Sequence, residues 1–140
     1  MDNANKRQHA ILAGINRTLR EALNCRTEEE LGEACLAVAE ELTGAAFGFL
    51  GALNDEGRLD DLAISDLGWR ECRIEGDRGL VLPRDLHVHG IYGSVLRNGE
   101  SLLSNDPAGH PESVGTPDGH PRLTSFLGVP LKRDGRSWGM

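Results

Sequence analysis

Two stretches near the N-terminus have the apolar spacing of helices. Between residues 6 and 23 apolar side chains recur every three or four positions and predict one apolar stripe along a helix: Ile11, Leu12, Ile15, Leu19, Ala22 and Leu23. A second helix is predicted to begin after Thr27, which forms a capping box with Glu30. Its apolar positions continue at helical spacing until Gly44, which favours a left-handed stop.

The next residues change to the pattern of strands. Residues 46–53 are continuously apolar, residues 54–57 are polar and end in Gly, and residues 59–65 become apolar again. This order predicts a β-hairpin. Residues 66–86 show no apolar period and are rich in Gly, Arg and acidic residues, which indicates an irregular connection or a short strand with a long loop.

The second half begins with a predicted helix over residues 90–98, which Gly99 ends, and a short strand over residues 101–104. Residues 105–122 have no apolar period. A loop of that length exceeds the ~12 to 15 residues usual in compact domains, and such loops are commonly lids or binding loops.

The C-terminal residues predict a second hairpin. Residues 125–132 alternate, Asp134 and Gly135 favour a tight turn, and residues 138–140 begin a strand that we expect to lie beside residues 46–53. This last strand is expected to be truncated, at a loss of stability. The order of elements predicts an α+β fold, an antiparallel β-sheet with its helices on one face.

Charge and composition exclude several classes of partner. Acidic residues outnumber basic ones by 22 to 15, for a net charge of −7, and no basic block is present, so nucleic acid is disfavoured. No apolar run approaches the ~20 residues that span a bilayer, and residues 1–8 are too polar for a signal peptide. We therefore expect a cytoplasmic protein with no membrane association. The odd set of cysteines without a CxxC pair (Cys25, Cys35 and Cys72) favours reduced thiols.

The side chains indicate binding rather than catalysis. Nucleophile, zinc-protease and phosphate-loop motifs are all absent from the sequence, so we expect no enzyme activity. Trp69 and Tyr92 are scarce aromatics that can stack on a planar ligand or pack in the core. Cys72 lies between Arg70 and Arg73, whose charges favour the thiolate, although a structural role or a redox thiol are alternatives.

Two histidines of the long loop are further candidates for ligand binding. His110 and His120 each precede a proline, and acidic residues are nearby in the loop. A labile metal site is chemically feasible there, whereas stabilisation of the loop turns is the simpler interpretation.

Several short motifs, taken together, resemble a known family. They are residues 41–44 (ELTG), 47–51 (FGFLG), 62–69 (LAISDLGW), 90–93 (GIYG), 105–107 (NDP), 119–121 (GHP) and 125–131 (SFLGVPL). From about Thr27 to its last residue the chain resembles a GAF domain of a bacterial or archaeal signalling protein, of the type found in sensor histidine kinases. The resemblance implies an antiparallel sheet of about five to six strands with flanking helices, and a small-molecule pocket on the face opposite the terminal helices.

The resemblance also limits the cofactor. The signature of GAF domains that bind cyclic nucleotides is absent, and so is a Cys-His pair for covalent bilin attachment, so both ligands are disfavoured. Some GAF domains bind haem through His or Cys. The resemblance therefore makes Cys72, with His110 or His120, a haem-ligand hypothesis in which Trp69 and Tyr92 line the same pocket.

Function is expected to divide between two parts of the chain. Residues 1–25 are interpreted as a signalling and dimerisation helix whose apolar stripe joins two copies, and residues 26–140 as the sensory domain. We expect a non-catalytic module that binds a small molecule or redox cofactor and signals to a kinase or other output domain, as in two-component signal transduction. The alternative is a ligand-free dimerisation or interaction module.

Overall fold

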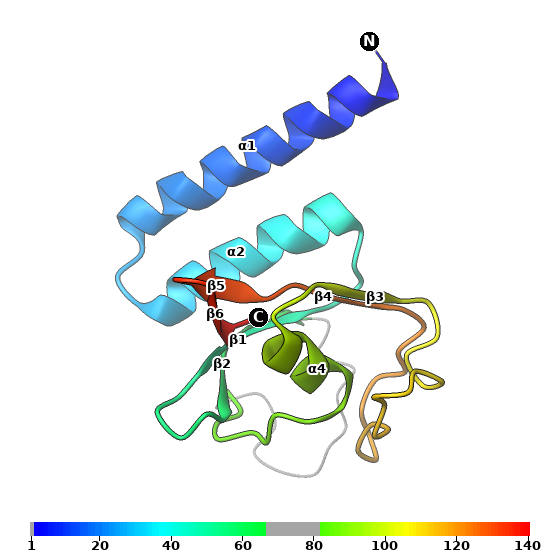
Figure 1. The fold of residues 1–140 in the computed structure, drawn as a ribbon. Coiled ribbons are helices and arrows are strands. Elements are labelled where there is room, and N and C mark those ends of the chain that lie inside the picture. The colour runs from blue at the N-terminus through cyan, green and yellow to red at the C-terminus, as the bar shows by residue number, and fades with distance from the viewer. Residues whose placement is uncertain (1, 67–81) are drawn as a thin grey trace.

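The computed structural model describes residues 2–66 and 82–140 of the 140-residue chain. Its helices are α1 (Asn3–Asn24), α2 (Glu28–Thr43) and α4 (Gly90–Asn98). Its strands are β1 (Phe49–Leu53), β2 (Leu59–Ile64), β3 (Leu102–Ser104), β4 (Phe126–Gly128), β5 (Leu131–Arg133) and β6 (Arg136–Gly139). The α+β fold with flanking helices is confirmed (Figure 1).

The ends of α2 follow the signals in the sequence. The Thr27 hydroxyl accepts a hydrogen bond from Glu30 N at 3.1 Å, and the Glu30 carboxylate accepts one from Arg26 N at 2.7 Å. At the other end Gly44 adopts a left-handed φ of 73°. Both caps satisfy backbone groups that the helix leaves unpaired at its ends.

The main sheet has four strands in the order β2-β1-β6-β5, all paired antiparallel. The predicted hairpin of β1 and β2 is confirmed, and β6 lies beside β1 as expected. A bulge interrupts the first pair: Leu50 opposes Ala63, whereas Gly51 opposes Asp61, so Leu62 is the extra residue on β2. A bulge changes which residues of a strand share a face.

The sheet carries helices on both faces, which corrects the expectation that all helices gather on one face (Figure 1). Gly32 of α2 packs on β2, since a Cβ there would lie 3.3 Å from the Cβ atoms of Leu62 and Ala63. On the opposite face the rings of Phe49 and Tyr92 pack edge to face, with centroids 6.3 Å apart. The sequence gives no sign of this division because helical periodicity does not record which sheet face a helix covers.

The segment predicted as one strand over residues 125–132 divides at Pro130. β4 ends at Gly128 and pairs with β3, while β5 begins at Leu131 and pairs with β6. Proline donates no backbone hydrogen bond, so it interrupts a ladder. The predicted turn between β5 and β6 is confirmed, because Asp134 and Gly135 both have positive φ, 51° and 77°.

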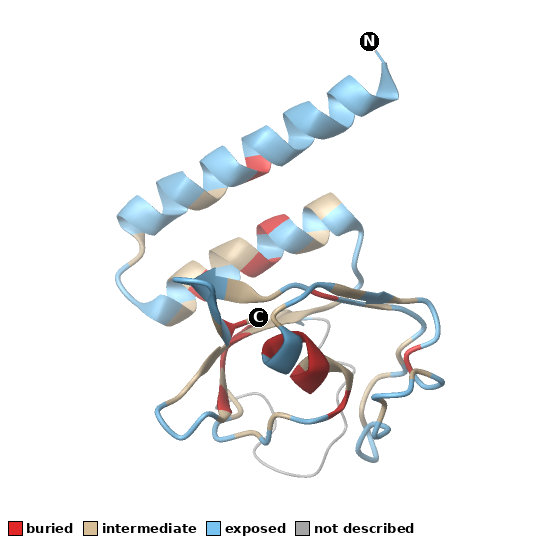
Figure 2. Cartoon of the chain, viewed as in Figure 1, coloured by how far each residue is buried: buried red, intermediate tan, exposed pale blue. Residues whose placement is uncertain are grey.

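Helix α1 contacts the rest of the molecule through its small residues. Gly14 is the one buried residue of α1, and a Cβ there would lie 2.9 Å from Val38 Cγ1 and 2.8 Å from Leu42 Cδ1 of α2. An ion pair of 2.6 Å between Arg17 and Glu41 joins the same two helices. The apolar side chains of α1 face solvent instead (Figure 2): Ile11, Leu12, Ile15, Leu19 and Leu23 are 41 to 86% exposed. We call these five residues the α1 stripe.

The close approach at Gly14 yields a prediction. Gly14→Val should force α1 away from α2, because overpacking at a tight contact costs about 1–3 kcal/mol. Ala13→Val, on an exposed position of the same helix, is the matched control. Amide hydrogen exchange along α1 should accelerate in the Gly14 variant and stay near wild type in the control. Equal exchange in the two variants would show that Gly14 does not hold the helices together.

Candidate functional site

Tyr92 is the predicted site residue that the structure places on the α4 face of the sheet. Its ring is half-buried and packs edge to face against Phe49 of β1 and His89 at the start of α4. Its hydroxyl donates a hydrogen bond to the backbone oxygen of His87. Trp69 and Cys72 lie outside the described residues.

The predicted loop over residues 105–122 has no regular helix or strand and contains His110 and His120. His110 Nδ1 accepts a hydrogen bond from Glu112 N at 3.1 Å, and His120 Nδ1 lies 2.7 Å from the Pro121 oxygen. These contacts stabilise turns within the loop. The loop is fastened to α4 by an ion pair of 2.9 Å between Arg97 and Glu112.

Tyr92 and the two loop histidines are not joined by any hydrogen bond, ring contact or ion pair in residues 2–66 and 82–140. No group of three or more His, Cys, Asp or Glu side chains in those residues is arranged to hold a metal ion. Whether these predicted residues share one ligand stays a prediction.

The sequence analysis missed Asp61, the most unusual side chain of the α4 face. Asp61 is only 4% exposed, and no described residue donates a hydrogen bond to its Oδ1 atom. Its side chain lies across β1 at Gly51, where a Cβ would be 3.1 Å from Oδ1. Gly51 and Phe49 are two positions apart on β1 and therefore lie on the same face of the sheet. Asp61 is paired with Gly51, so its carboxylate faces the side of the sheet that Tyr92 occupies.

Its neighbour Asp60 shows the contrast between a partnered and an unpartnered carboxylate. Asp60 accepts hydrogen bonds from Asp85 N at 2.7 Å and Asn54 Nδ2 at 3.2 Å, and Arg84 lies 3.6 Å away. The hydrogen bond from Asp85, aided by Arg84, holds the Asp60 pKa below its usual range. Arg84 also pairs with Glu29 of α2 at 3.4 Å, so its charge is shared by two other carboxylates.

Burial and charge act in the opposite direction on Asp61. Burial raises the pKa of Asp61 to about 7, the adjacent Asp60 carboxylate adds to this rise, and Arg84 opposes it. The pKa of Tyr92 is also raised, mainly by burial and further by the charge of Asp61. The two side chains therefore lie within electrostatic reach of each other. Asp61 changes charge near neutral pH, as residues of binding sites often do.

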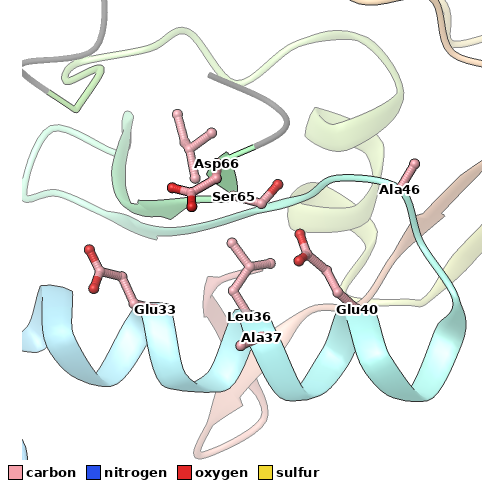
Figure 3. Close-up of a pocket in the computed structure, with 8 residues that line it drawn as sticks. Glu33, Leu36, Ala37, Glu40, Ala46, Ser65 and Asp66 are labelled. Carbon is pink, nitrogen blue, oxygen red and sulfur yellow. The ribbon is translucent and has the colours of Figure 1, made fainter. Parts of the chain in front are cut away.

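A second candidate site is a pocket of about 490 Å³ on the α2 side (Figure 3). Glu33, Leu36 and Glu40 point from α2 toward Ser65 and Asp66, which follow β2. Glu40 Oε1 is buried and receives no hydrogen bond from a described residue. Among the described residues, the pocket is lined by the carboxylates of Glu33, Glu40 and Asp66 and by no basic side chain, so this part of the lining suits a positively charged group.

The two described cysteines do not form a disulfide. Cys25 and Cys35 are free, and burial is the main cause that raises the pKa of each thiol. A raised pKa keeps a thiol protonated and lowers its reactivity. Both residues are therefore free thiols of low reactivity in this structure.

The raised pKa of Asp61 predicts how stability depends on pH. The native carboxyl binds more protons than the unfolded one between the ordinary pKa of 3.8 and about 7, so its contribution to stability is lost as pH rises through that window. Asp61→Asn removes this pH-dependent loss of stability. The free energy of unfolding of the variant, relative to that of wild type, should grow by up to about 4 kcal/mol from pH 4 to pH 8.

Denaturant unfolding of both proteins across this pH range measures the difference. Asp60→Asn is the control and should show little change with pH over this range, because the pKa of Asp60 is lowered and its charge changes below the ordinary pKa of 3.8. A difference between wild type and Asp61→Asn that does not change with pH would contradict the prediction.

Comparisons with known proteins agree with this architecture. A family model described as GAF domain matches residues 25–140. The GAF domain of a phosphoenolpyruvate-protein phosphotransferase (ptsP) from Coxiella burnetii is similar, with a TM-score of 0.74, 19% identity, and coverage of 99% of this chain and 76% of that one. The corresponding domain from Acinetobacter gives a TM-score of 0.66 at 16% identity, over 99% of this chain and 75% of that one.

No helix in the described residues is long and apolar enough to span a membrane. The chain belongs to the GAF domain family.

Proposed function

We propose that this GAF domain is a non-catalytic sensory module that binds a small molecule on the α4 face of its sheet and transmits a change through its helices. The observation that carries the proposal is the layered contact from site to surface. Asp61 and Tyr92 occupy one face of the sheet, α2 packs on the other, and α1 packs on α2 while its apolar stripe stays exposed. A shift of the sheet against α2 is therefore passed to an interaction surface.

The output domain is proposed from the proteins in which similar GAF domains occur. Sensor histidine kinases were predicted from sequence motifs, and the similar solved domains belong to phosphoenolpyruvate-protein phosphotransferases. Kinases and phosphotransferases both handle phosphoryl groups, and this shared chemistry supports the proposal of such an output. We propose a kinase or phosphotransferase output domain in the cytoplasm, with two-component signalling as one form of it and with neither nucleic acid nor membrane as a partner.

The partner of the α1 stripe is proposed to be the same stripe of a second copy. Five large apolar side chains on one side of a helix form a continuous surface that water solvates poorly. Two such stripes pack against each other in coiled-coil fashion. The alternative function, a ligand-free interaction module, includes the same dimer, and the exposed α1 stripe supports it equally. The two functions differ in whether the α4 face binds a ligand.

The dimer predicts the effect of charge on the stripe. Ile15→Glu and Leu19→Glu should convert a dimer to a monomer at about 20 μM, because each buries a carboxylate in an apolar seam. Ala13→Glu adds the same charge at an exposed position outside the stripe and should leave the dimer intact. Light scattering coupled to size exclusion measures the mass. A wild-type monomer, or a dimer that tolerates both stripe substitutions, would rule out this interface.

Haem binding is tested separately, as the cofactor that the resemblance implies. Haem held by a thiolate or imidazole should give an intense Soret band, which replacement of an axial side chain shifts or abolishes. The purified protein is titrated with haem and compared with Cys72→Ala, His110→Ala and His120→Ala. A lack of stoichiometric uptake would exclude haem without affecting family membership. Uptake that is insensitive to all three substitutions would assign the axial ligands elsewhere.

A further inference from the structure

We propose that Asp61 is the anchoring carboxylate of the ligand site on the α4 face, and that the ligand presents a small organic cation to it, an ammonium or guanidinium head. This inference rests on the proposed function, because it names the ligand class for the same face of the sheet. It follows from three observations: an acceptor without a donor, aromatic rings beside it, and a backbone arranged to hold the carboxylate in place.

The first observation is the missing donor. Asp61 Oδ1 is buried without a hydrogen bond from a described residue, whereas the donors near its neighbour Asp60 are used by other carboxylates. Asp85 N and Asn54 Nδ2 bind Asp60, and the Arg84 guanidinium lies near Asp60 and Glu29. Buried acceptors in folded proteins are nearly always paired, so an unpaired one calls for an explanation. A ligand that brings its own N–H groups supplies the missing partner.

The second observation favours a cation over a neutral donor. The Asp61 carboxylate lies on this face, the charge of the neighbouring Asp60 adds to the rise of its pKa, and Asp61 raises the pKa of Tyr92, so the local potential is negative. Tyr92 and Phe49 add aromatic rings on the same face, and ring faces attract ammonium and guanidinium groups. An anionic ligand would meet repulsion from Asp61. A positively charged head is attracted both to the carboxylate of Asp61 and to the aromatic rings.

The third observation is that the chain accommodates this carboxylate at a cost to its own stability. The bulge at Leu50 and Gly51 turns Asp61 to the α4 face, and the missing side chain of Gly51 leaves the room that Asp61 occupies. A buried unpaired carboxylate destabilises a fold, and a neutral residue of similar size is usually tolerated better. A group that weakens the fold but serves a ligand is the expected trade-off at a binding site.

The experiment compares small probes of different charge, among which the three benzyl and benzoyl compounds are matched in shape. Benzylamine, agmatine and putrescine are the cationic probes, benzyl alcohol is the neutral counterpart of benzylamine, and benzoate is the anionic one. Binding is measured by titration calorimetry at pH 8, and the site by amide shifts in ¹H–¹⁵N spectra. At least one cation should bind wild type and shift the amides of Gly51, Asp61 and Tyr92. Benzyl alcohol and benzoate should bind at least about tenfold more weakly than the cation.

Two variants locate the carboxylate responsible. Asp61→Asn should weaken cation binding at least about tenfold while the protein stays folded by its ¹H–¹⁵N spectrum. Glu40→Gln is the matched control for the α4 face, because Glu40 Oε1 is also buried without a hydrogen bond from a described residue but lies in the pocket of Figure 3, on the α2 side. In this variant the cation should shift the amides of Gly51, Asp61 and Tyr92 as it does in wild type. Shifts of these three amides that survive Asp61→Asn, or that are lost in Glu40→Gln, would overturn the proposal.

The pH profile gives a second readout. Of the groups whose charges act on Asp61 or respond to it, Asp60 has a lowered pKa, Tyr92 a raised one, and the Arg84 guanidinium opposes the rise of the Asp61 pKa, so Asp61 itself changes charge between pH 6 and 8. Cation affinity should fall up to about tenfold per pH unit below 7. The profile is repeated in His89→Gln, because His89 packs on Tyr92. A profile that flattens in His89→Gln would transfer the effect to the histidine and contradict the assignment.

The outcomes separate this inference from the proposed function. If benzyl alcohol or benzoate binds the α4 face and no cation does, small-molecule binding stands and the choice of a cation is wrong. If no probe of any charge binds, both the cation and a small-molecule site on this face are contradicted, and the ligand-free alternative gains support.

Discussion

The close backbone pairing at Gly51 is the constraint on which the other features of the domain depend. Gly51 exchanges both of its hydrogen bonds with Met140, at 2.9 and 3.0 Å, which joins the last strand to the first. On the other side of β1, the same residue marks the bulge and leaves room for Asp61. A Cβ at this position would lie 3.0 Å from Leu59 Cδ1 and 3.1 Å from Asp61 Oδ1, so the room for Asp61 depends on this glycine.

The sheet separates two chemically different environments. On the α4 face, Tyr92 and Phe49 share a side of the sheet with Asp61, whose pKa burial raises to about 7 and whose Oδ1 has no hydrogen bond from a described residue. On the α2 face, Gly32 brings the helix close to β2, and the acidic pocket opens where the strand ends. Both environments are negative, in keeping with the net charge of −7. They differ in burial, since Asp61 is almost fully enclosed whereas Glu33 and Asp66 of the α2 pocket are exposed.

Helix α1 has an uncommon relation to the rest of the domain. It meets α2 through Gly14 and the Arg17–Glu41 ion pair, and therefore buries little apolar surface of its own. Its large apolar side chains are exposed. Helix α2 touches both α1 and the sheet and therefore connects the two. The family to which the chain belongs is consistent with such a regulatory arrangement.

Local signals in the sequence determined the helices, their caps, the two hairpins and the long loop, because each depends on neighbouring residues: Thr27 with Glu30, Gly44, and Asp134 with Gly135. Tertiary structure decided the rest. Strict alternation along β2 would place Asp61 on one face with Ala63, and only the bulge opposite Gly51 moves the two to different faces. The pair of aspartates in an otherwise apolar strand was the available signal for a buried charge. Which of them found partners was decided by Asn54, Arg84 and Asp85, brought there by chain contacts that no local pattern records.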